Sequence, residues 1–180
     1  MAHRSPHSIK WRRSTSWKDP RLSYPPPHYE GDIGVVSATF RSGTQPADLS
    51  YGGRNIHYLA TGRSTGGAFG LYRWNFGPDE SGPGPHFHRV MSESFFVLEG
   101  TVSLYDGERW REGRAGDFLH VPPGGVHAFR NVIGAPASIL LLFTPGAPRE
   151  AYFETLAELA AGRELGEQEA CTASELVHVV

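Results

Sequence analysis

The chain has 180 residues, of which 39% are hydrophobic and 20% charged, a composition typical of one soluble globular domain. The formal net charge of −2 lacks the basic excess of a nucleic-acid-binding protein, and no apolar run is long enough for a membrane helix. The 22 glycines and 14 prolines favour many turns and short strands over a helical bundle.

Residues 1–30 are basic, polar and rich in proline, and they end in YPPPHYEG. They predict an arm or linker without a core of its own rather than a transit peptide, because apolar side chains for an amphipathic helix are too few. The segment lacks the apolar core of a secretory signal, and the chain has a single cysteine, Cys171. These features predict a cytoplasmic protein in which Cys171 is an ordinary free thiol.

From Asp32 onward, short segments rich in β-branched and aromatic residues alternate with glycine-bearing turns. We expect strands over residues 33–40, 55–62, 67–76, 94–100, 101–107, 117–122, 126–132 and 138–145. Short strands at this spacing predict an all-β sandwich or barrel over residues 31–148. One helix is predicted over residues 149–162, where Phe153, Leu156, Ala157 and Ala160 share a face, and residues 149–180 form a C-terminal helix and tail.

The stretch GPGPHFHRVMSESFFVLEG, residues 82–100, places two histidines one residue apart. Side chains at i and i+2 of an extended segment point the same way, and Pro85 favours extension, so His86 and His88 should face one ion together. Glu93 follows after a short turn and would bring a carboxylate from a neighbouring strand. These three residues form the first half of a predicted metal site.

A fourth ligand is predicted in GDFLHVPPGGVHAFRN, residues 116–131, where His127 follows a Pro-Pro-Gly-Gly turn. If His127 points inward, the same alternation sends Phe129 and Asn131 inward. We expect the other histidines to be less involved, with His57 as a hydrogen-bonded strand residue and His120 as a packing residue or a neighbour of the ligands.

Both stretches resemble the paired motifs of the cupin superfamily. The first motif is matched at His86, His88, Glu93 and Gly100, and it departs from the pattern at Glu80, where the family has glycine. The second motif is matched in full, at Gly116, Pro122, Gly124, His127 and Asn131. The resemblance implies a jelly-roll barrel, the cupin double-stranded β-helix, whose interior holds one divalent transition metal on His86, His88, Glu93 and His127. Fe, Ni, Mn, Co, Cu and Zn all suit such ligands.

Within the superfamily, the stretch HFHRVMSESFFVLEGTVSLYDG resembles the single-barrel, quercetinase-like group. That resemblance implies a metal-dependent dioxygenase, an oxidoreductase acting on a flavonol-like or other enolisable aromatic compound, with dioxygen as co-substrate and Glu93 as the catalytic proton acceptor. A metal-dependent isomerase, cyclase or lyase and a non-catalytic small-molecule binder are the alternatives. The resemblance also implies a homodimer, and inward alternation predicts a pocket lined by Phe95, Val97 and Phe129.

Overall fold

The computed structural model describes residues 26–164, 166 and 178–179. The predictions for Cys171 and for the first 25 residues of the arm lie outside this range. The chain forms two compact units, Met1–Phe40 and Arg41–Val180, and each is considered by itself.

The strand predicted over residues 33–40 is wrong, because this segment is neither strand nor helix. Its apolar side chains are exposed, with Val36 fully accessible to solvent and Ile33 and Phe40 80% and 90% exposed. Strand propensity measures how well a side chain fits a paired, half-buried surface, and in the described part of the chain this segment pairs with no other strand.

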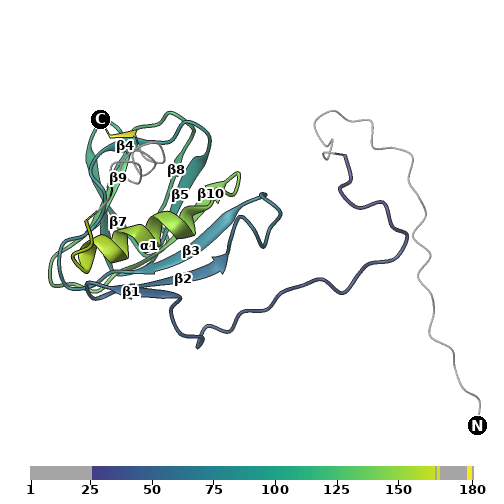
Figure 1. Ribbon diagram of the computed structural model, residues 1–180. Coiled ribbons are helices and arrows are strands. Elements are labelled where there is room, and N and C mark those ends of the chain that lie inside the picture. Colours follow the sequence, from purple (N-terminus) through teal and green to yellow (C-terminus); the bar gives the residue numbers. More distant parts are fainter. Residues whose placement is uncertain (1–25, 165, 167–177, 180) are drawn as a thin grey trace, which may run out of the picture. The chain divides into compact units, whose positions relative to one another are not determined.

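The second unit is built almost entirely from antiparallel strands (Figure 1). They are β1 Leu49–Tyr51, β2 Arg54–Ala60, β3 Gly70–Asn75, β4 His86–Phe87, β5 Ser92–Glu99, β6 Thr101–Tyr105, β7 Trp110–Arg114, β8 Phe118–Val121, β9 Ala128–Asn131, β10 Ser138–Thr144 and β11 His178–Val179. A six-stranded sheet has the order β1-β2-β3-β10-β5-β8, a three-stranded sheet has the order β7-β6-β9, and β11 pairs with β4. This is the cupin β-barrel that the motifs imply.

The barrel core follows from strict alternation along the strands. In β10, between β3 and β5, Ile139, Leu141 and Phe143 are buried, while Leu140 and Leu142 on the other face are only partly covered. From β6 of the smaller sheet, Val102 and Leu104 are buried against the same core. Each fully buried side chain of this kind contributes about 1.5–3 kcal/mol relative to an exposed one.

Gly100 marks the point where the chain passes from one sheet to the other. It separates β5 from β6, which belong to different sheets. Its φ of +71° lies in the left-handed region, and a Cβ atom there would overlap the carbonyl oxygen of Pro136. The glycine that ends the first motif is therefore required by the backbone and not by the site.

The first motif departs from the family pattern at Glu80, and Gly82 explains why the fold tolerates this. Gly82 has a φ of +147°, and a Cβ atom there would overlap the carbonyl oxygen of Phe129. Glu80 is instead largely exposed, and its carboxylate lies 3.5 Å from Arg130. The close backbone approach thus falls two residues later than the pattern places it.

Asn131, the last residue of the second motif, holds the loop ahead of β4. It is buried, its Nδ2 donates to the carbonyl oxygens of Gly77 and Asp79 at 3.0 Å each, and its Oδ1 accepts from the Ser81 amide at 2.8 Å. The sequence predicted that this side chain points inward, and the structure adds its task of fixing residues 77–81.

Replacing Asn131 with alanine is expected to lower the free energy of unfolding by about 2–4 kcal/mol, because buried backbone groups lose their partners. Urea denaturation of both proteins measures the difference. The matched control is Asn55→Ala, an exposed asparagine on β2, which should change the free energy of unfolding by about 0.5 kcal/mol or less. Equal effects of the two changes would contradict the role of Asn131.

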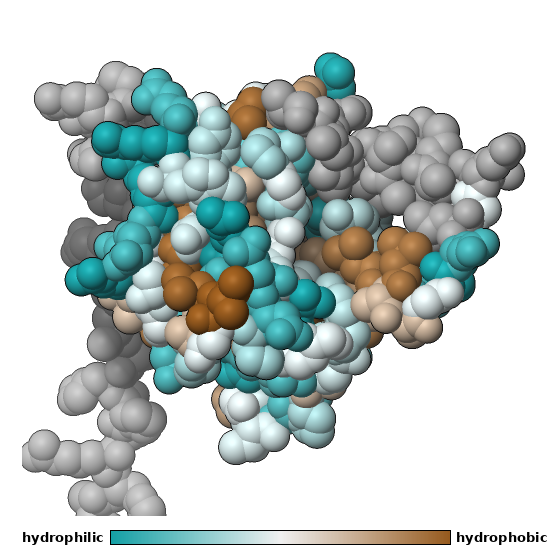
Figure 2. All heavy atoms as spheres, turned by 90° about the vertical axis from the view of Figure 1, so that its left-hand side faces the viewer, coloured by the Kyte–Doolittle hydropathy of each residue, from teal (hydrophilic) through white to brown (hydrophobic). Residues whose placement is uncertain are grey.

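The predicted helix is confirmed as α1, Arg149–Ala160, and Gly162 follows it with a φ of +91°. Phe153 packs edge-on against Tyr72 and Trp74 of β3, with ring centroids 5.2 and 5.4 Å apart. Within the described residues, no helix combines the length and apolar character needed to cross a membrane. Figure 2 shows hydrophobic residues reaching the surface in patches among hydrophilic ones.

Strands β1, β4, β7 and β11 were not predicted from the sequence. Strands β4 and β11 have two residues each and β1 has three, too few for alternation to be recognised. Strand β7, with the sequence WREGR, is exposed at every position except Gly113 and therefore has no apolar face.

Candidate metal centre

The four residues predicted as ligands come from three places in the chain that the barrel brings together. His86 is on β4, Glu93 is on β5, and His88 and His127 lie just outside β4 and β9. His86 and His127 form an isolated bridge in which each amide donates to the other residue's carbonyl oxygen at 2.9 Å. The Gly124 amide also donates to the His88 carbonyl oxygen at 2.8 Å, so the Pro-Pro-Gly-Gly turn is tied to the first motif.

The ligand atoms of these four residues converge, lying within 4.8 Å of one another. Glu93 Oε2 is 3.0 Å from His88 Nε2 and 2.9 Å from His127 Nε2, and the four residues are 1–3% exposed. Two ligands held about 2.1 Å from one ion at a right angle would be about 3.0 Å apart. The spacing and the chemistry of three imidazoles and one carboxylate therefore fit a single transition-metal ion.

Backbone carbonyls set the orientation of two of the imidazoles. Nδ1 of His86 lies 2.9 Å from the Gly84 carbonyl oxygen, and Nδ1 of His127 lies 2.9 Å from that of Gly125. Because a carbonyl oxygen can only accept, each Nδ1 carries the hydrogen and donates it. The Nε2 atom of each ring is thus left for the cluster, as metal-binding histidines require.

The cluster also shifts the pKa values of its members. Burial alone would raise the pKa of Glu93, but hydrogen bonds from His127 and His88 outweigh it and lower the pKa to about 2. Burial would lower the pKa of His127, whereas Glu93 raises it above the usual value. Burial, followed by the nearby His127, lowers the pKa of His86 to about 4. At neutral pH, Glu93 is therefore ionised and His86 neutral.

The metal-free protein is expected to lose stability as the pH falls from about 4.5 toward 2. The folded pKa of Glu93, about 2, lies below its reference value of 4.5, so the unfolded chain takes up this proton first. The stabilisation is complete above pH 4.5, and the shift corresponds to about 3 kcal/mol of unfolding free energy. Urea denaturation across this window, in chelator, should show a shallower pH dependence for Glu93→Gln. The same pH dependence for both proteins would contradict the prediction.

A cavity of about 250 Å³ opens beside Glu93 and His86. Its wall is mostly aromatic and apolar, with the charged residue Arg54 among its members, and comes from β1, β2, β3, β9, β10, α1 and the loop ahead of β4. Of the three residues predicted to line a pocket, Phe129 does so, but Phe95 and Val97 are buried in the core away from it. Alternation predicts whether a side chain points into the barrel. Whether an inward side chain also lines the cavity depends on its position along the barrel.

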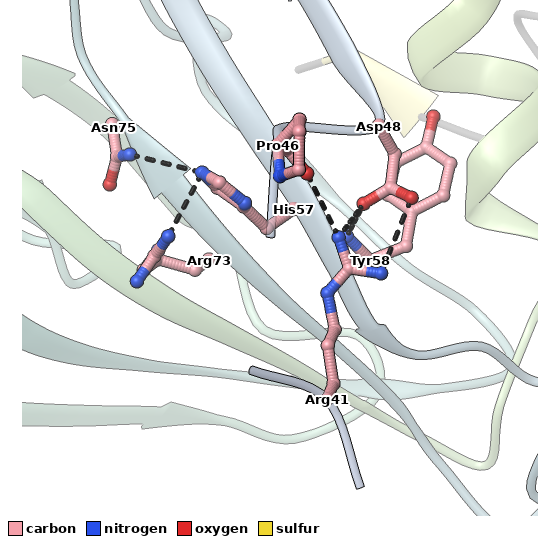
Figure 3. A network of polar contacts seen from close by, with 7 residues as sticks. All are labelled: Arg41, Pro46, Asp48, His57, Tyr58, Arg73 and Asn75. Atoms are coloured by element: carbon pink, nitrogen blue, oxygen red, sulfur yellow. Dashed lines mark hydrogen bonds and ion pairs between the residues drawn. The ribbon is translucent and has the colours of Figure 1, made fainter. Parts of the chain in front are cut away.

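The other histidines of the described residues lie outside the cluster. His57 is buried on β2 beside Arg73 and Asn75 of β3, and its Nε2 lies 3.0 Å from Arg73 Nη2 and 3.4 Å from Asn75 Nδ2 (Figure 3). Trp74, on the other face of β3, lines the cavity. His120, predicted to be a packing residue or a neighbour of the ligands, is neither, because it is exposed and bonded to Ser94 on the outward face of β5 and β8.

The comparison with protein families agrees with this geometry, since residues 72–143 match the cupin domain family. This segment is a cupin domain. It contains both motifs, and its barrel resembles those of quercetinase-like cupins.

Individual relatives match only part of the chain. The chain is 31% identical to quercetin 2,3-dioxygenase of Bacillus subtilis (strain 168) over 98 residues. This match covers 54% of the chain and 28% of the relative. The chain is also 34% identical to a germin-like protein, subfamily 2 member 5, of Arabidopsis thaliana over 85 residues. This match covers 43% of the chain and 38% of the relative. The chain thus spans well under half the length of these two relatives.

Among solved structures, KdgF from Halomonas sp. superposes with a TM-score of 0.54. The match covers 63% of this chain and 97% of KdgF, at 15% sequence identity. At this identity, the likeness concerns the fold alone.

Proposed function

We propose that this cupin is a metal-dependent dioxygenase that acts on a compact, enolisable or hydroxylated aromatic compound. The observation that supports it most is the aromatic cavity that opens directly onto Glu93 and His86. The partial likeness to quercetin 2,3-dioxygenase supports the same reaction class. The volume of about 250 Å³ lies just below the roughly 300–1,000 Å³ of most ligand pockets and favours a compact substrate.

His86, His88, Glu93 and His127 would hold the metal. A divalent transition metal supplies Lewis acidity, which lowers the pKa of a substrate hydroxyl. Glu93 is ionised at neutral pH and would accept the hydroxyl proton on its carboxylate.

The cavity wall would orient the ring of the substrate. Trp74, Phe129 and Tyr152 offer flat apolar surfaces on which an aromatic compound can stack. The same surfaces leave few polar groups to hold water beside the reacting carbon, which protects a reactive carbanion from protonation by solvent.

Oxygen uptake tests the proposal. The full chain, reconstituted separately with Fe, Ni, Mn and Co, is incubated with flavonols, β-diketones and smaller hydroxylated aromatics in an oxygen electrode. We expect stoichiometric oxygen consumption with at least one pair of metal and substrate. Product formation in the absence of oxygen would identify an isomerase, cyclase or lyase instead, and no turnover with any metal would leave a non-catalytic binder.

A homodimer is also proposed, with its interface on the outward face of β5 and β8. Phe96 and Phe118 are paired across these strands and are 40% and 63% exposed, and Leu98 continues the patch. Sedimentation velocity at micromolar concentration should show a dimer for the native chain and a monomer for Phe118→Glu. A native monomer would contradict the proposal.

The cytoplasmic location and the domain boundaries stay predictions.

A further inference from the structure

Arg149, the first residue of α1, is a charged residue buried in the wall of the cavity. It is 4% exposed and lines the cavity together with Glu93 and His86. Its guanidinium carbon lies 4.4 Å from the ring centroid of Tyr152 and 5.0 Å from that of Phe143. The flat faces of the guanidinium are thus packed on aromatic rings, while its N–H groups point along its edge.

Two of these edge groups have no hydrogen-bond partner among the described residues. Nε and Nη1 of Arg149 are buried without a hydrogen-bond partner, and no carboxylate of the described residues forms an ion pair with the side chain. Burial lowers the pKa of Arg149, but an arginine stays protonated in proteins. Buried arginines are nearly always paired, because an unpaired buried charge is strongly destabilising. An unpaired one beside a cavity therefore indicates a partner that comes from outside the chain.

A second hydrogen-bond donor also lacks a partner. The indole Nε1 of Trp74, which also lines the cavity, is buried without a partner. Glu93 Oε2 is already within hydrogen-bond distance of His88 and His127. Two side chains of the cavity wall, Arg149 and Trp74, thus carry donors without a partner among the described residues, and this arrangement suits a ligand that carries acceptors and a negative charge.

We propose that Arg149 binds a carboxylate of the substrate, with Trp74 as a further donor. The proposal rests on the proposed function, because it assigns the substrate of the same cavity to the class of hydroxylated aromatic carboxylates. Guanidinium and carboxylate match in a bidentate pair, whereas a neutral amide offers one acceptor and no charge. Arg149 therefore sets specificity for an acid over its neutral analogue.

The test compares binding of the three hydroxybenzoates with binding of the three hydroxybenzamides, by isothermal titration calorimetry. The full chain is used in its metal-loaded and metal-free forms, so that the result does not depend on turnover. We expect at least one hydroxybenzoate to bind 10-fold or more tightly than its amide in both forms. Arg149→Met, which keeps the side-chain length without the charge, should reduce this preference to less than 2-fold.

Two further variants separate a binding role from a folding role. Arg149→Lys keeps the charge without the planar fork and should retain part of the preference, and Trp74→Phe should weaken carboxylate binding roughly 2- to 10-fold by removing one donor. The matched control is Arg130→Met. The Arg130 guanidinium also lies 4.4 Å from an aromatic ring, that of Trp110, but it is partly exposed and outside the cavity, so the preference should not change.

Absence of hydroxybenzoate binding, equal binding of acids and amides, or an unchanged preference in Arg149→Met would each overturn the inference. A retained preference without oxygen uptake would defeat the dioxygenase proposal alone. Oxygen uptake restricted to neutral compounds, with no preference for acids, would defeat the assignment of Arg149 alone.

Discussion

Replacing His127 with alanine is expected to lower the affinity of the protein for a divalent transition metal by more than about 100-fold, since loss of even a supporting contact costs about 10–100-fold. His127 Nε2 lies 2.9 Å from the Glu93 oxygen at the centre of the cluster, and the side chain is 1% exposed. Alanine would remove one ligand, and in this buried site water would replace it poorly. Elemental analysis of the purified protein and competition with a chromophoric chelator measure the loss.

His120→Ala is the matched control for this experiment. His120 belongs to the same barrel but lies exposed and bonded to Ser94 on the outward face. Its removal should leave the metal content and affinity unchanged. If His127→Ala kept the native metal content, the cluster would not be the metal centre, and the proposed reaction would lose its basis.

The convergence of His86, His88, Glu93 and His127 could be anticipated because it depends on local rules. Alternation places His86 and His88 on one side of an extended segment, and the motif spacing fixes where Glu93 and His127 follow. The sheet arrangement then needs only to align two short stretches. The His86–His127 backbone bridge does this, because it joins the first motif directly to the second.

The cavity could not be anticipated in the same way. Its wall combines residues from distant strands with α1, and their closeness depends on how the helix packs on the barrel. Arg149 shows the difference most clearly, because in the sequence it was only the first residue of an amphipathic helix. Its burial and its unpaired N–H groups emerge only when Phe143, Tyr152 and Phe153 are packed around it. The one available signal was an arginine three residues after the FTPG stretch, and this was not recognised.

Replacing Glu93 with glutamine is expected to reduce kcat, per bound metal, by about 10²–10⁴-fold, the usual contribution of a positioned general base. Glutamine has nearly the same shape and keeps an oxygen in the place of Glu93 Oε2, which lies 3.0 and 2.9 Å from the Nε2 atoms of His88 and His127. It cannot take a proton. The measurement is oxygen uptake with the substrate found for the native chain, divided by the metal content of each sample.

Glu99→Gln, which alters an exposed carboxylate at the end of the same strand, is the control and should keep the native kcat. The pH dependence distinguishes proton acceptance from mere ligation. A substrate hydroxyl that no longer has Glu93 to receive its proton must lose it to solvent, so the residual rate of Glu93→Gln should rise with pH where the native rate is flat. A native kcat per bound metal in Glu93→Gln would show that Glu93 serves as a ligand only, and the proton would then have to leave by a group outside the cluster.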